Sequence, residues 1–526
     1  MKRLLTNYYR NINLIKQTQL FKTSTYPSIY RNLSTINNNI NKPGSVASNE
    51  IKTYWEDLNL VLHEPGFETF GSLEMKPPTK TLTELLKNCT SITNSGVGDL
   101  LPSLSAKQIC QTYENLDIKE KLKFLIFLVK EFGVSREESI PLVRDYIDKY
   151  NTKENNQVLS RLEQTLKQCL TPKYVRFFDQ VLRLPNGMEF LVKMRKDTLA
   201  IYKTTKDKDL LTFSNYLKDS LQSSLIGYLR LDRITWNSSA FTMEKMMEYE
   251  YVHPFKDWDD MKQRLGPGRR VFGFFHKSMS LDPLVYIQVA LLKNIASNVP
   301  SILNDPTAGT LGKDNITAAI FYSINTQKGL SGVDLGSFLI KRVVEELKSQ
   351  FPNLTTFCTL SPIPGLRDWI LSKTEETDLL TRDEFNQIKS LNQLESDKEV
   401  LQAIKEYSTN FSWLTSNNQK AQAVLEPIFM RLASRYLIIE KKGKYTLNPV
   451  ANFHIRNGAC IHRLNWMGDL SNYRLEESLG IMVNYNYLQH RIEQVNETYL
   501  VNATVPVSNP DLYNTYKDLS KVELFQ

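Results

Sequence analysis

Ser361 occupies an unusual position for a hydroxyl, between an apolar run and a Pro-Ile-Pro-Gly turn in "TLSPIPGLRDWI", residues 359–370. Pro362 and Pro364 fix their backbone φ angles and stiffen this turn. Open α/β sheets bind ligands at the carboxyl ends of their strands, so a serine held there is a candidate catalytic group. A serine before proline is also a common helix cap, and a helix is expected to begin near Gly365. The residue types leave both interpretations open.

His454 is the second side chain that could do chemistry, because a histidine near its ordinary pKa is the usual proton carrier in enzymes. It lies in "NPVANFHIRNGA", where Asn452, Arg456 and Asn457 could orient its ring. The alternative is a histidine that only fills the surface or the core. His276, in "FFHKSMSLDP", is a secondary candidate at another expected strand end.

A glycine-containing loop joins an expected strand, residues 316–324, to an expected helix in "AAIFYSINTQKGLSGVDLGSFLIKRVVEELKSQFP". Gly329, Gly332 and Gly336 let the backbone approach a ligand closely, and the N–H groups at a helix start attract anions. The junction is therefore a candidate pyrophosphate site, although its spacing fits neither the G-x-G-x-x-G nor the Walker A pattern. A plain strand-loop-helix corner is the alternative. The expected apolar stripe of the helix consists of Leu335, Phe338, Leu339, Val343 and Leu347.

Helices are expected to dominate residues 50–223. Apolar residues recur at three- and four-residue steps in "VLSRLEQTLKQCL", "KEKLKFLIFLVKEFGV" and "IPLVRDYIDKY". A helical bundle is the natural way to bury such stripes, so we assign these residues to a helical domain. The charged stretch "KMRKDTLAIYKTTKDKD" is expected to be a solvated face without chemistry.

Strand-like segments replace the helical pattern over residues 224–526. "RRVFGFFH", "ITAAIFYSIN" and "TTFCTL" are rich in aromatic and β-branched residues, and each is followed by a helix-like stretch. This alternation predicts an α/β domain, with a charged helical insertion near residues 373–422. The predicted fold is thus a helical domain followed by an α/β domain.

The charge of the chain is unevenly distributed. Of its 65 Lys and Arg residues, seven lie within residues 1–49, which contain no Asp or Glu, and the rest of the chain is nearly neutral. This composition is typical of a mitochondrial targeting segment, and a disordered Asn-rich tail is the alternative. A neutral body argues against a nucleic-acid track, and no apolar run reaches the 18 residues that a membrane span needs.

The five cysteines occur singly, without a C-x-x-C pair, which favours reduced thiols in a matrix or cytosolic compartment. Cys460 lies between His454 and His462, yet no carboxylate or second cysteine cluster completes a ligand set. We therefore predict no metal site.

Six motifs together resemble, in order and spacing, the malonyl-CoA decarboxylase family: "GFFHKSMSLDPL", the loop segment above, "LSPIPG", "NPVANFHIRNGA", "RLNWMGD" and "GIMVNYNY". The resemblance covers the chain after the leader. It implies a helical domain followed by a catalytic domain of the GNAT acyltransferase fold. In that fold a strand-loop-helix junction binds the pyrophosphate of coenzyme A.

The resemblance also implies roles for individual residues. Ser361 corresponds to the serine that the family labels a proton acceptor, and His454 to the histidine labelled a proton donor. Tyr487, in "NYNY", matches a tyrosine expected near the active site. Substrate contacts are expected at Ser323, Thr326, Gln327, Gly329, Ser331, Gly332, Val333, Asp334, Leu335, Gly336, Ser337, Ser361 and His454.

The implied activity is the decarboxylation of malonyl-CoA to acetyl-CoA and CO2 through an enolate, without a cofactor. Two alternatives stay open: acyl transfer from coenzyme A to an acceptor amine, and an acyl-CoA-binding sensor without catalysis. The resemblance further implies a homo-oligomer, a tetramer. From its charge and its apolar runs, the chain is expected to bind no nucleic acid and to have no integral membrane association. Some members end in a peroxisomal Ser-Lys-Leu, whereas this chain ends "KVELFQ", which favours the mitochondrial matrix.

Overall fold

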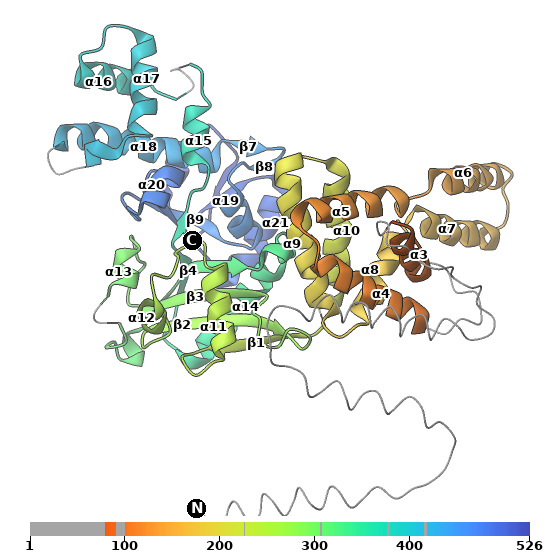
Figure 1. Ribbon diagram of the computed structural model, residues 1–526. Coiled ribbons are helices and arrows are strands. Elements are labelled where there is room, and N and C mark those ends of the chain that lie inside the picture. The colour runs from red at the N-terminus through yellow and green to blue at the C-terminus, as the bar shows by residue number, and fades with distance from the viewer. Residues whose placement is uncertain (1–78, 91–99, 226, 306–307, 376–378, 415–417) are drawn as a thin grey trace, which may run out of the picture. The chain divides into compact units, whose positions relative to one another are not determined.

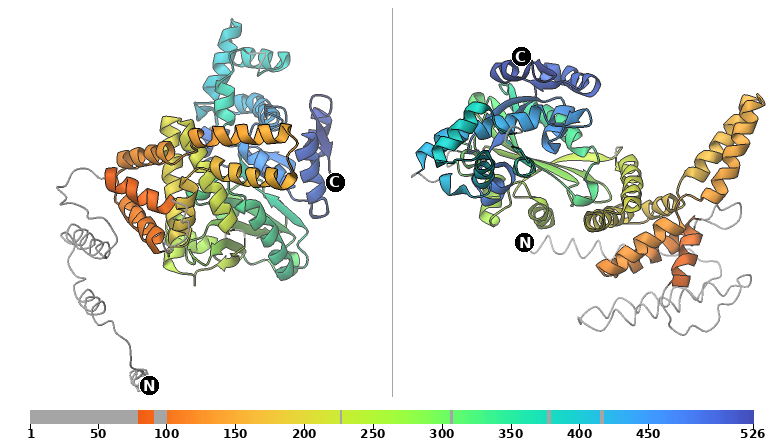
Figure 2. Two further views of the ribbon diagram at one scale, coloured as in Figure 1. Left: turned by 90° about the vertical axis from the view of Figure 1, so that its right-hand side faces the viewer. Right: turned by 90° about the horizontal axis from the view of Figure 1, so that it is seen from above.

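A run of α-helices without strands opens the part of the chain that the structure, a computed structural model, describes (Figure 1). The described residues are 79–90, 100–225, 227–305, 308–375, 379–414 and 418–526, so the predicted targeting segment lies outside them. The three predicted helical segments are confirmed, and α7 packs its half-buried leucine stripe beside α6 (Figure 2). The helices are α3 (Thr79–Thr90), α4 (Leu100–Glu114), α5 (Ile118–Glu131), α6 (Arg136–Asn151), α7 (Asn156–Leu170), α8 (Tyr174–Leu182), α9 (Gly187–Thr205) and α10 (Lys208–Leu225).

A mixed sheet of ten strands follows in the described residues, in the spatial order β1-β2-β3-β4-β5-β10-β9-β11-β12, with β6 also paired to β10. The first four strands are antiparallel, β4 and β5 are parallel, and β10 is antiparallel to both β5 and β9. The strands are β1 (Leu229–Ile234), β2 (Arg269–His276), β3 (Val285–Leu292), β4 (Ala318–Thr326), β5 (Thr356–Thr359), β6 (Ser361–Pro362), β9 (Cys460–Asn465), β10 (Met482–Asn486), β11 (Val505–Val507) and β12 (Val522–Leu524).

The predicted order, helices followed by a sheet domain with helices, is confirmed. The segment "RRVFGFFH" matches β2 residue for residue. The expectation that each strand precedes a helix is wrong for β2, because β3 follows it after a short connection. Antiparallel neighbours need only such a short connection, whereas parallel neighbours need a crossover.

Most of the remaining helices surround the sheet, and several begin at clear capping signals. The charged region predicted as an insertion contains α16 and α17, and both start with capping boxes, formed by Thr381 with Glu384 and by Ser396 with Glu399. A two-stranded sheet of β7 (Lys441–Lys442) and β8 (Tyr445–Thr446) follows α18. The helices are α11 (Ala240–Tyr249), α12 (Trp258–Arg264), α13 (Pro300–Leu303), α14 (Leu335–Gln350), α15 (Leu366–Leu371), α16 (Arg382–Asn392), α17 (Asp397–Tyr407), α18 (Gln419–Ile438), α19 (Pro449–Arg456), α20 (Asn472–Ser478), α21 (Ile492–Asn502) and α22 (Pro510–Tyr516).

The two faces of the sheet are covered by different helices. On one face Phe272, Phe274 and Phe321 belong to a core that includes residues of α14, and α14 contacts β2, β3 and β4. On the other, Val271 and Phe275 pack with α11 and α12. The alternation follows from the two-residue period of a strand. Phe338, predicted in the buried stripe of α14, is instead 48% exposed.

The ladder between β4 and β5 ends early. It pairs Ala318 with Thr356 and ends at Phe321 with Thr359, whereas β4 continues to Thr326. The chain after β5 turns to β10, because Ser361 pairs with Val483. The carboxyl end of β5 therefore separates from β4 at the point where Ser361 lies. No helix of the described residues has both the length and the apolar character that a membrane crossing requires.

Candidate active site

Ser361 is the first residue of β6 and is nearly buried, with 7% of its surface exposed. Its hydroxyl donates to Thr359 Oγ1 at 3.0 Å and lies 3.3 Å from His454 Nε2. The alternative that Ser361 caps the following helix is wrong. Gly365 is the N-cap of α15, with φ of 82°, and no side chain caps that helix. A left-handed cap position suits glycine, so the turn needs no serine.

His454 lies on α19, whose start is set by Asn448 and Pro449. Asn448 Oδ1 accepts the backbone N–H of Ala451 at 2.8 Å, and proline tolerates the first helical position because it has no N–H to lose. The His454 ring is 4% exposed. Its partners come from other elements, since Nδ1 lies 2.9 Å from the hydroxyl of Tyr487. The expectation that its sequence neighbours orient the ring is therefore wrong.

Those neighbours have partners elsewhere. Asn452 Oδ1 accepts the hydroxyl of Tyr499 at 2.9 Å, and the guanidinium of Arg456 lies over the ring of Tyr445. Side chains one or two positions apart on a helix point in different directions, so sequence proximity was a poor guide to contact.

The contacts at the two ring nitrogens of His454 depend on its tautomer, because each nitrogen can donate or accept. Within the described part of the chain, the Tyr487 hydroxyl has no partner other than Nδ1, and we assign it as the donor to this nitrogen. A neutral imidazole that accepts at Nδ1 carries its proton on Nε2, which then donates to Ser361 Oγ. Ser361 can accept this bond because its own proton is directed to Thr359. The result is one directed chain from Tyr487 to Thr359.

Burial keeps His454 neutral. Loss of solvent lowers the pKa of His454 to about 3, because the protein interior disfavours the charged imidazolium. Its ring stacks on that of Tyr485 with centroids 4.7 Å apart. Burial raises the pKa of Tyr487 above its ordinary value, so this hydroxyl stays protonated as a donor. The site can therefore offer a neutral N–H donor in surroundings with little water.

Thr359 and Tyr485 were missed as site residues by the sequence reasoning. Thr359 Oγ1 accepts from Ser361 and from the backbone N–H of Tyr485 at 3.1 Å. The Tyr485 hydroxyl is buried and has no partner among the described residues. The period of two in "NYNY" was a usable signal, because it puts Tyr485 and Tyr487 on the same face of the sheet. Thr359 likewise lies two residues from Ser361.

The predicted anion-binding loop begins where β4 ends, and several of its own side chains are buried and anchor it to the protein. Thr326 closes β4, and Gln327 is buried with its Nε2 donating to the carbonyl of Pro283 at 3.3 Å. Val333 and Leu335 are buried in the hydrophobic core. These side chains hold the loop in place and leave its backbone to face solvent.

The outer side of the loop consists of Ser331, Gly332 and Asp334, all exposed. The backbone N–H groups of Gly332 and Asp334 have no acceptor among the described residues. Asp334 is the N-cap of α14, but its carboxylate accepts no backbone N–H of the helix and instead accepts the hydroxyl of Ser337 at 2.5 Å. Free N–H groups at a helix start suit a phosphate, although the Asp334 carboxylate opposes it.

Glycine is favoured at Gly332 and at Gly336 for different structural reasons. Gly332 has φ of 78° and open space where a side chain would lie. A Cβ at Gly336 would lie 2.9 Å from the ring of Phe453, which contacts the His454 ring with centroids 5.0 Å apart. The close packing of Gly336 on Phe453 thus brings the start of α14 next to α19 and its histidine.

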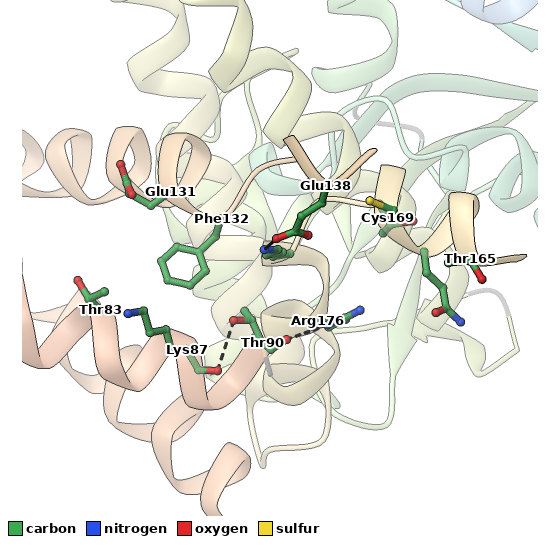
Figure 3. Close-up of a pocket in the computed structure, with 12 residues that line it drawn as sticks. Thr83, Lys87, Thr90, Glu131, Phe132, Glu138, Thr165, Cys169 and Arg176 are labelled. Atoms are coloured by element: carbon green, nitrogen blue, oxygen red, sulfur yellow. Dashed lines mark hydrogen bonds and ion pairs between the residues drawn. The ribbon is translucent and has the colours of Figure 1, made fainter. Parts of the chain in front are cut away.

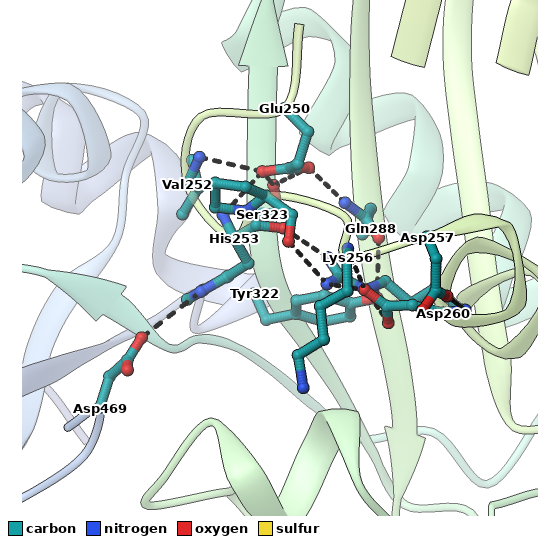
Figure 4. A network of polar contacts seen from close by, with 12 residues as sticks. Glu250, Val252, His253, Lys256, Asp257, Asp260, Gln288, Tyr322, Ser323 and Asp469 are labelled. Carbon is teal, nitrogen blue, oxygen red and sulfur yellow. Dashed lines mark hydrogen bonds and ion pairs between the residues drawn. The ribbon is translucent and has the colours of Figure 1, made fainter. Parts of the chain in front are cut away.

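Ser323 lies apart from the other predicted substrate contacts. It pairs with Gln288, and its hydroxyl donates to the carboxylate of Glu250 at 2.8 Å on the sheet face opposite Phe321 (Figure 4). Glu250 also accepts from Asn325 at 2.7 Å and from Tyr286 at 3.2 Å. This network fixes α11 to β3 and β4, and the position of Ser323 does not support a substrate contact.

A cavity of about 600 Å³ lies among α3, α6, α7 and α8, far along the chain from the residues above (Figure 3). Three of its charged groups have partners: Lys173 pairs with Glu138 at 2.8 Å, and Arg176 donates to the carbonyl of Thr90 at 2.9 Å. It contains none of the predicted site residues. Within the described residues, no cluster of three or more His, Cys, Asp or Glu could hold a metal ion.

The expectation that "KMRKDTLAIYKTTKDKD" forms a solvated charged face is wrong at Arg195. This side chain of α9 is 4% exposed and donates to the carbonyls of Gly329 and Ser331 in the loop, at 2.6 and 2.7 Å. Its neighbours Lys193 and Lys196 are exposed and pair with Glu189 and Glu248, as expected of a solvated face. Composition could not separate one buried arginine from lysines beside it.

Comparisons with known sequences match both parts of the chain. Residues 227–518 match the family described as "Malonyl-CoA decarboxylase C-terminal domain", and residues 132–224 match "Malonyl-CoA decarboxylase N-terminal domain". The chain is 40% identical to the mitochondrial malonyl-CoA decarboxylase of Rattus norvegicus over 363 residues, which are 67% of this chain and 73% of that protein. It is 36% identical to that of Anser anser anser over 385 residues, 71% of this chain and 75% of that protein.

Solved structures agree with the sequence matches. The malonyl-CoA decarboxylase of Rhodopseudomonas palustris is similar with a TM-score of 0.69 at 30% identity, covering 83% of this chain and 99% of that one. The enzyme of Agrobacterium vitis gives a TM-score of 0.68 at 30% identity, over 82% and 99% of the two chains. The chain belongs to the malonyl-CoA decarboxylase family.

Proposed function

We propose that this chain decarboxylates malonyl-CoA to acetyl-CoA and CO2. The observation that supports this most is the buried hydrogen-bond chain of Tyr487, His454, Ser361 and Thr359 at the carboxyl end of β5. Family membership supports the substrate.

The chemistry needs three things from the protein. The bond between the carboxylate carbon and the α-carbon breaks, its electron pair passes into the thioester as an enolate, and CO2 leaves. The α-carbon then takes one proton, which solvent restores to the site. The thioester is the electron sink, so the protein must exclude water from the carboxylate, hold the enolate oxygen and deliver the proton.

His454 is the group we assign to the enolate and its protonation. Its Nε2–H is a neutral donor, because burial lowers the pKa of His454 to about 3. A neutral imidazole can donate to a developing oxyanion without being a stronger acid than the enol it faces. When Nε2 gives up its proton, the Tyr487 hydroxyl at Nδ1 can move its own proton toward the ring.

Ser361 is assigned to substrate orientation and to holding the His454 proton in place before substrate binds. Its Oγ accepts from Nε2 in the unliganded site, and its own proton is committed to Thr359. A serine hydroxyl is a weak base alone, so the histidine governs the protonation of this pair.

The diphosphate of coenzyme A is assigned to the outer side of the loop, at the free N–H groups of Gly332 and Asp334 and the start of α14. The packing of Gly336 on Phe453 places this loop beside α19, so the thioester end can reach His454.

Incubation of the purified protein with carboxyl-labelled malonyl-CoA, without an acceptor, tests this function. Equal amounts of labelled CO2 and acetyl-CoA are expected, and His454→Asn is the inactive control. An acyltransferase would need an amine before any product forms. A sensor would bind malonyl-CoA and release nothing, and either result would refute the proposal.

We further propose that the protein acts in the mitochondrial matrix as a homo-oligomer. The acid-free basic composition of residues 1–49 and the mitochondrial relatives support the location. Deletion of residues 1–49 is expected to abolish import and leave activity intact, measured by fluorescence localisation and turnover. Light scattering of the purified chain tests the oligomer, for which a tetramer is expected.

A further inference from the structure

Arg195 brings a side chain of α9 into the loop of the proposed coenzyme A site. Its Nη1 and Nη2 donate to the carbonyl oxygens of Gly329 and Ser331, and Nε donates to the carbonyl of Ser214 on α10 at 3.0 Å. One buried guanidinium therefore joins two helices to the loop.

The backbones of α9 and the loop also touch. A Cβ added at Gly329 would lie 2.1 Å from the carbonyl oxygen of Val192, one turn before Arg195 on α9. No side chain larger than that of glycine fits at this contact. The loop is thus built against α9 by shape as well as by hydrogen bonds.

The bond to Ser331 sets the direction of the next N–H group. In a trans peptide the carbonyl and the following N–H point in opposite directions, and the described residues contain no cis peptide. Because the Ser331 carbonyl points to Arg195, the N–H of Gly332 points away from it. Gly332 is exposed there, and its N–H has no acceptor among the described residues. This is the orientation in which backbone amides bind phosphate.

Arg195 also places charge behind the loop. All three of its acceptors are neutral backbone carbonyls. Burial lowers the pKa of Arg195 to about 10, an effect that the nearby Asp219 opposes, so the guanidinium remains protonated at neutral pH. A positive charge that is hydrogen-bonded only to carbonyls attracts an anion on the other side of the loop more than one in a direct ion pair would.

We infer that Arg195 is a positioning residue for the phosphates of coenzyme A, which orients the Ser331–Gly332 peptide and supplies positive charge behind it. This inference rests on the proposed function for the identity of the ligand. It gives the helical part of the chain a role in substrate binding that acts through the loop.

Two substrates separate this role from a purely structural one. Malonyl-pantetheine has the reacting thioester of malonyl-CoA but lacks its adenosine phosphates. Arg195→Met is expected to raise KM for malonyl-CoA about 10-fold or more with kcat little changed, and to leave kcat/KM for malonyl-pantetheine at the wild-type value. Arg195→Lys keeps the charge but not the planar fork, so an intermediate KM is expected. Arg176→Met is the matched control, because Arg176 also donates to a backbone carbonyl of the helical part but lies outside the loop.

An equal loss with both substrates would show a general structural role and overturn the inference, as would an unchanged KM for malonyl-CoA. If Arg195→Met does not fold, Arg195→Lys decides by the same comparison. Calorimetric titration with coenzyme A tests the inference independently of the proposed function. The wild type could bind coenzyme A, with weaker binding by Arg195→Met, and yet release no CO2. This result would refute decarboxylation and support the inference.

Discussion

His454 and Ser361 are 93 positions apart in the sequence, yet Nε2 of the one lies 3.3 Å from Oγ of the other. The helix α19 carries the histidine, and the short strand β6 carries the serine. Both are tied to β10: β6 pairs with it directly, and Tyr487, just after its end, contacts the histidine. The contact therefore depends on the order of strands in the sheet.

Thr359 is expected to affect kcat because it sets the direction in which the Ser361 hydroxyl points. Thr359→Val keeps the shape but removes the acceptor of Ser361 and of the Tyr485 N–H. The Ser361 proton must then turn toward Nε2, which already carries one. We expect kcat to fall roughly 10-fold or more, with KM little changed and a stability loss of about 1–3 kcal/mol from the unpaired donors. Thr359→Ser should restore kcat, and turnover with the thermal midpoint on the same preparations checks both effects. A wild-type kcat per folded Thr359→Val molecule would show that this direction is irrelevant.

Tyr487→Phe tests the tautomer of His454. The ring is retained, but Nδ1 loses its donor, so the proton is no longer held on Nε2. We expect kcat to fall roughly 10²-fold, the lower end of the loss typical of one proton-transfer partner, with KM nearly constant. Nitrogen NMR of labelled histidine should show the Nε2–H tautomer in the wild type and a mixture in the variant. An Nδ1–H tautomer in the wild type would reverse the direction of the whole hydrogen-bond chain.

The buried His454 should make the fold sensitive to acid. Burial lowers the pKa of His454 to about 3 in the folded protein, whereas an unfolded histidine has its ordinary pKa of about 6.5. Between these values the unfolded chain binds a proton that the folded protein does not, so acid favours unfolding. The contribution is complete above about pH 6.5 and is lost progressively as the pH falls toward 3, by about 1.4 kcal/mol per pH unit.

Denaturant unfolding across this pH range measures the effect. The stability advantage of the wild type over His454→Asn should shrink as the pH falls below about 6.5. His490 is exposed on the 3-10 helix η6 (Gln489–Arg491), and His490→Gln provides the matched control at a surface histidine. Parallel curves for the wild type and His454→Asn would mean that His454 takes up a proton equally in both states.

Local pattern predicted the elements well and the contacts between them poorly. The strand at β2 and the helices α5 to α7 follow from residue periodicity, which acts within one element. The approach of Arg195 to Gly329 spans 134 positions, and nothing in the charged sequence around Arg195 distinguishes it from the exposed Lys193. Phe338 shows the reverse error, because this residue at an apolar helical position is 48% exposed although its ring contacts that of Phe274. Side-chain partners are set by tertiary packing, to which periodicity is blind.

The most direct test of the account is the decarboxylation rate of malonyl-CoA by Ser361→Ala, His454→Asn and the double variant. If both groups act on one transition state, each single change should lower kcat by roughly 10²-fold or more, the scale of losing one such interaction. The kcat of the double variant should then lie within a small factor of the kcat of the slower single variant. A double variant slowed by the product of the two single effects would contradict the account, and so would a single variant that keeps the wild-type kcat per folded molecule.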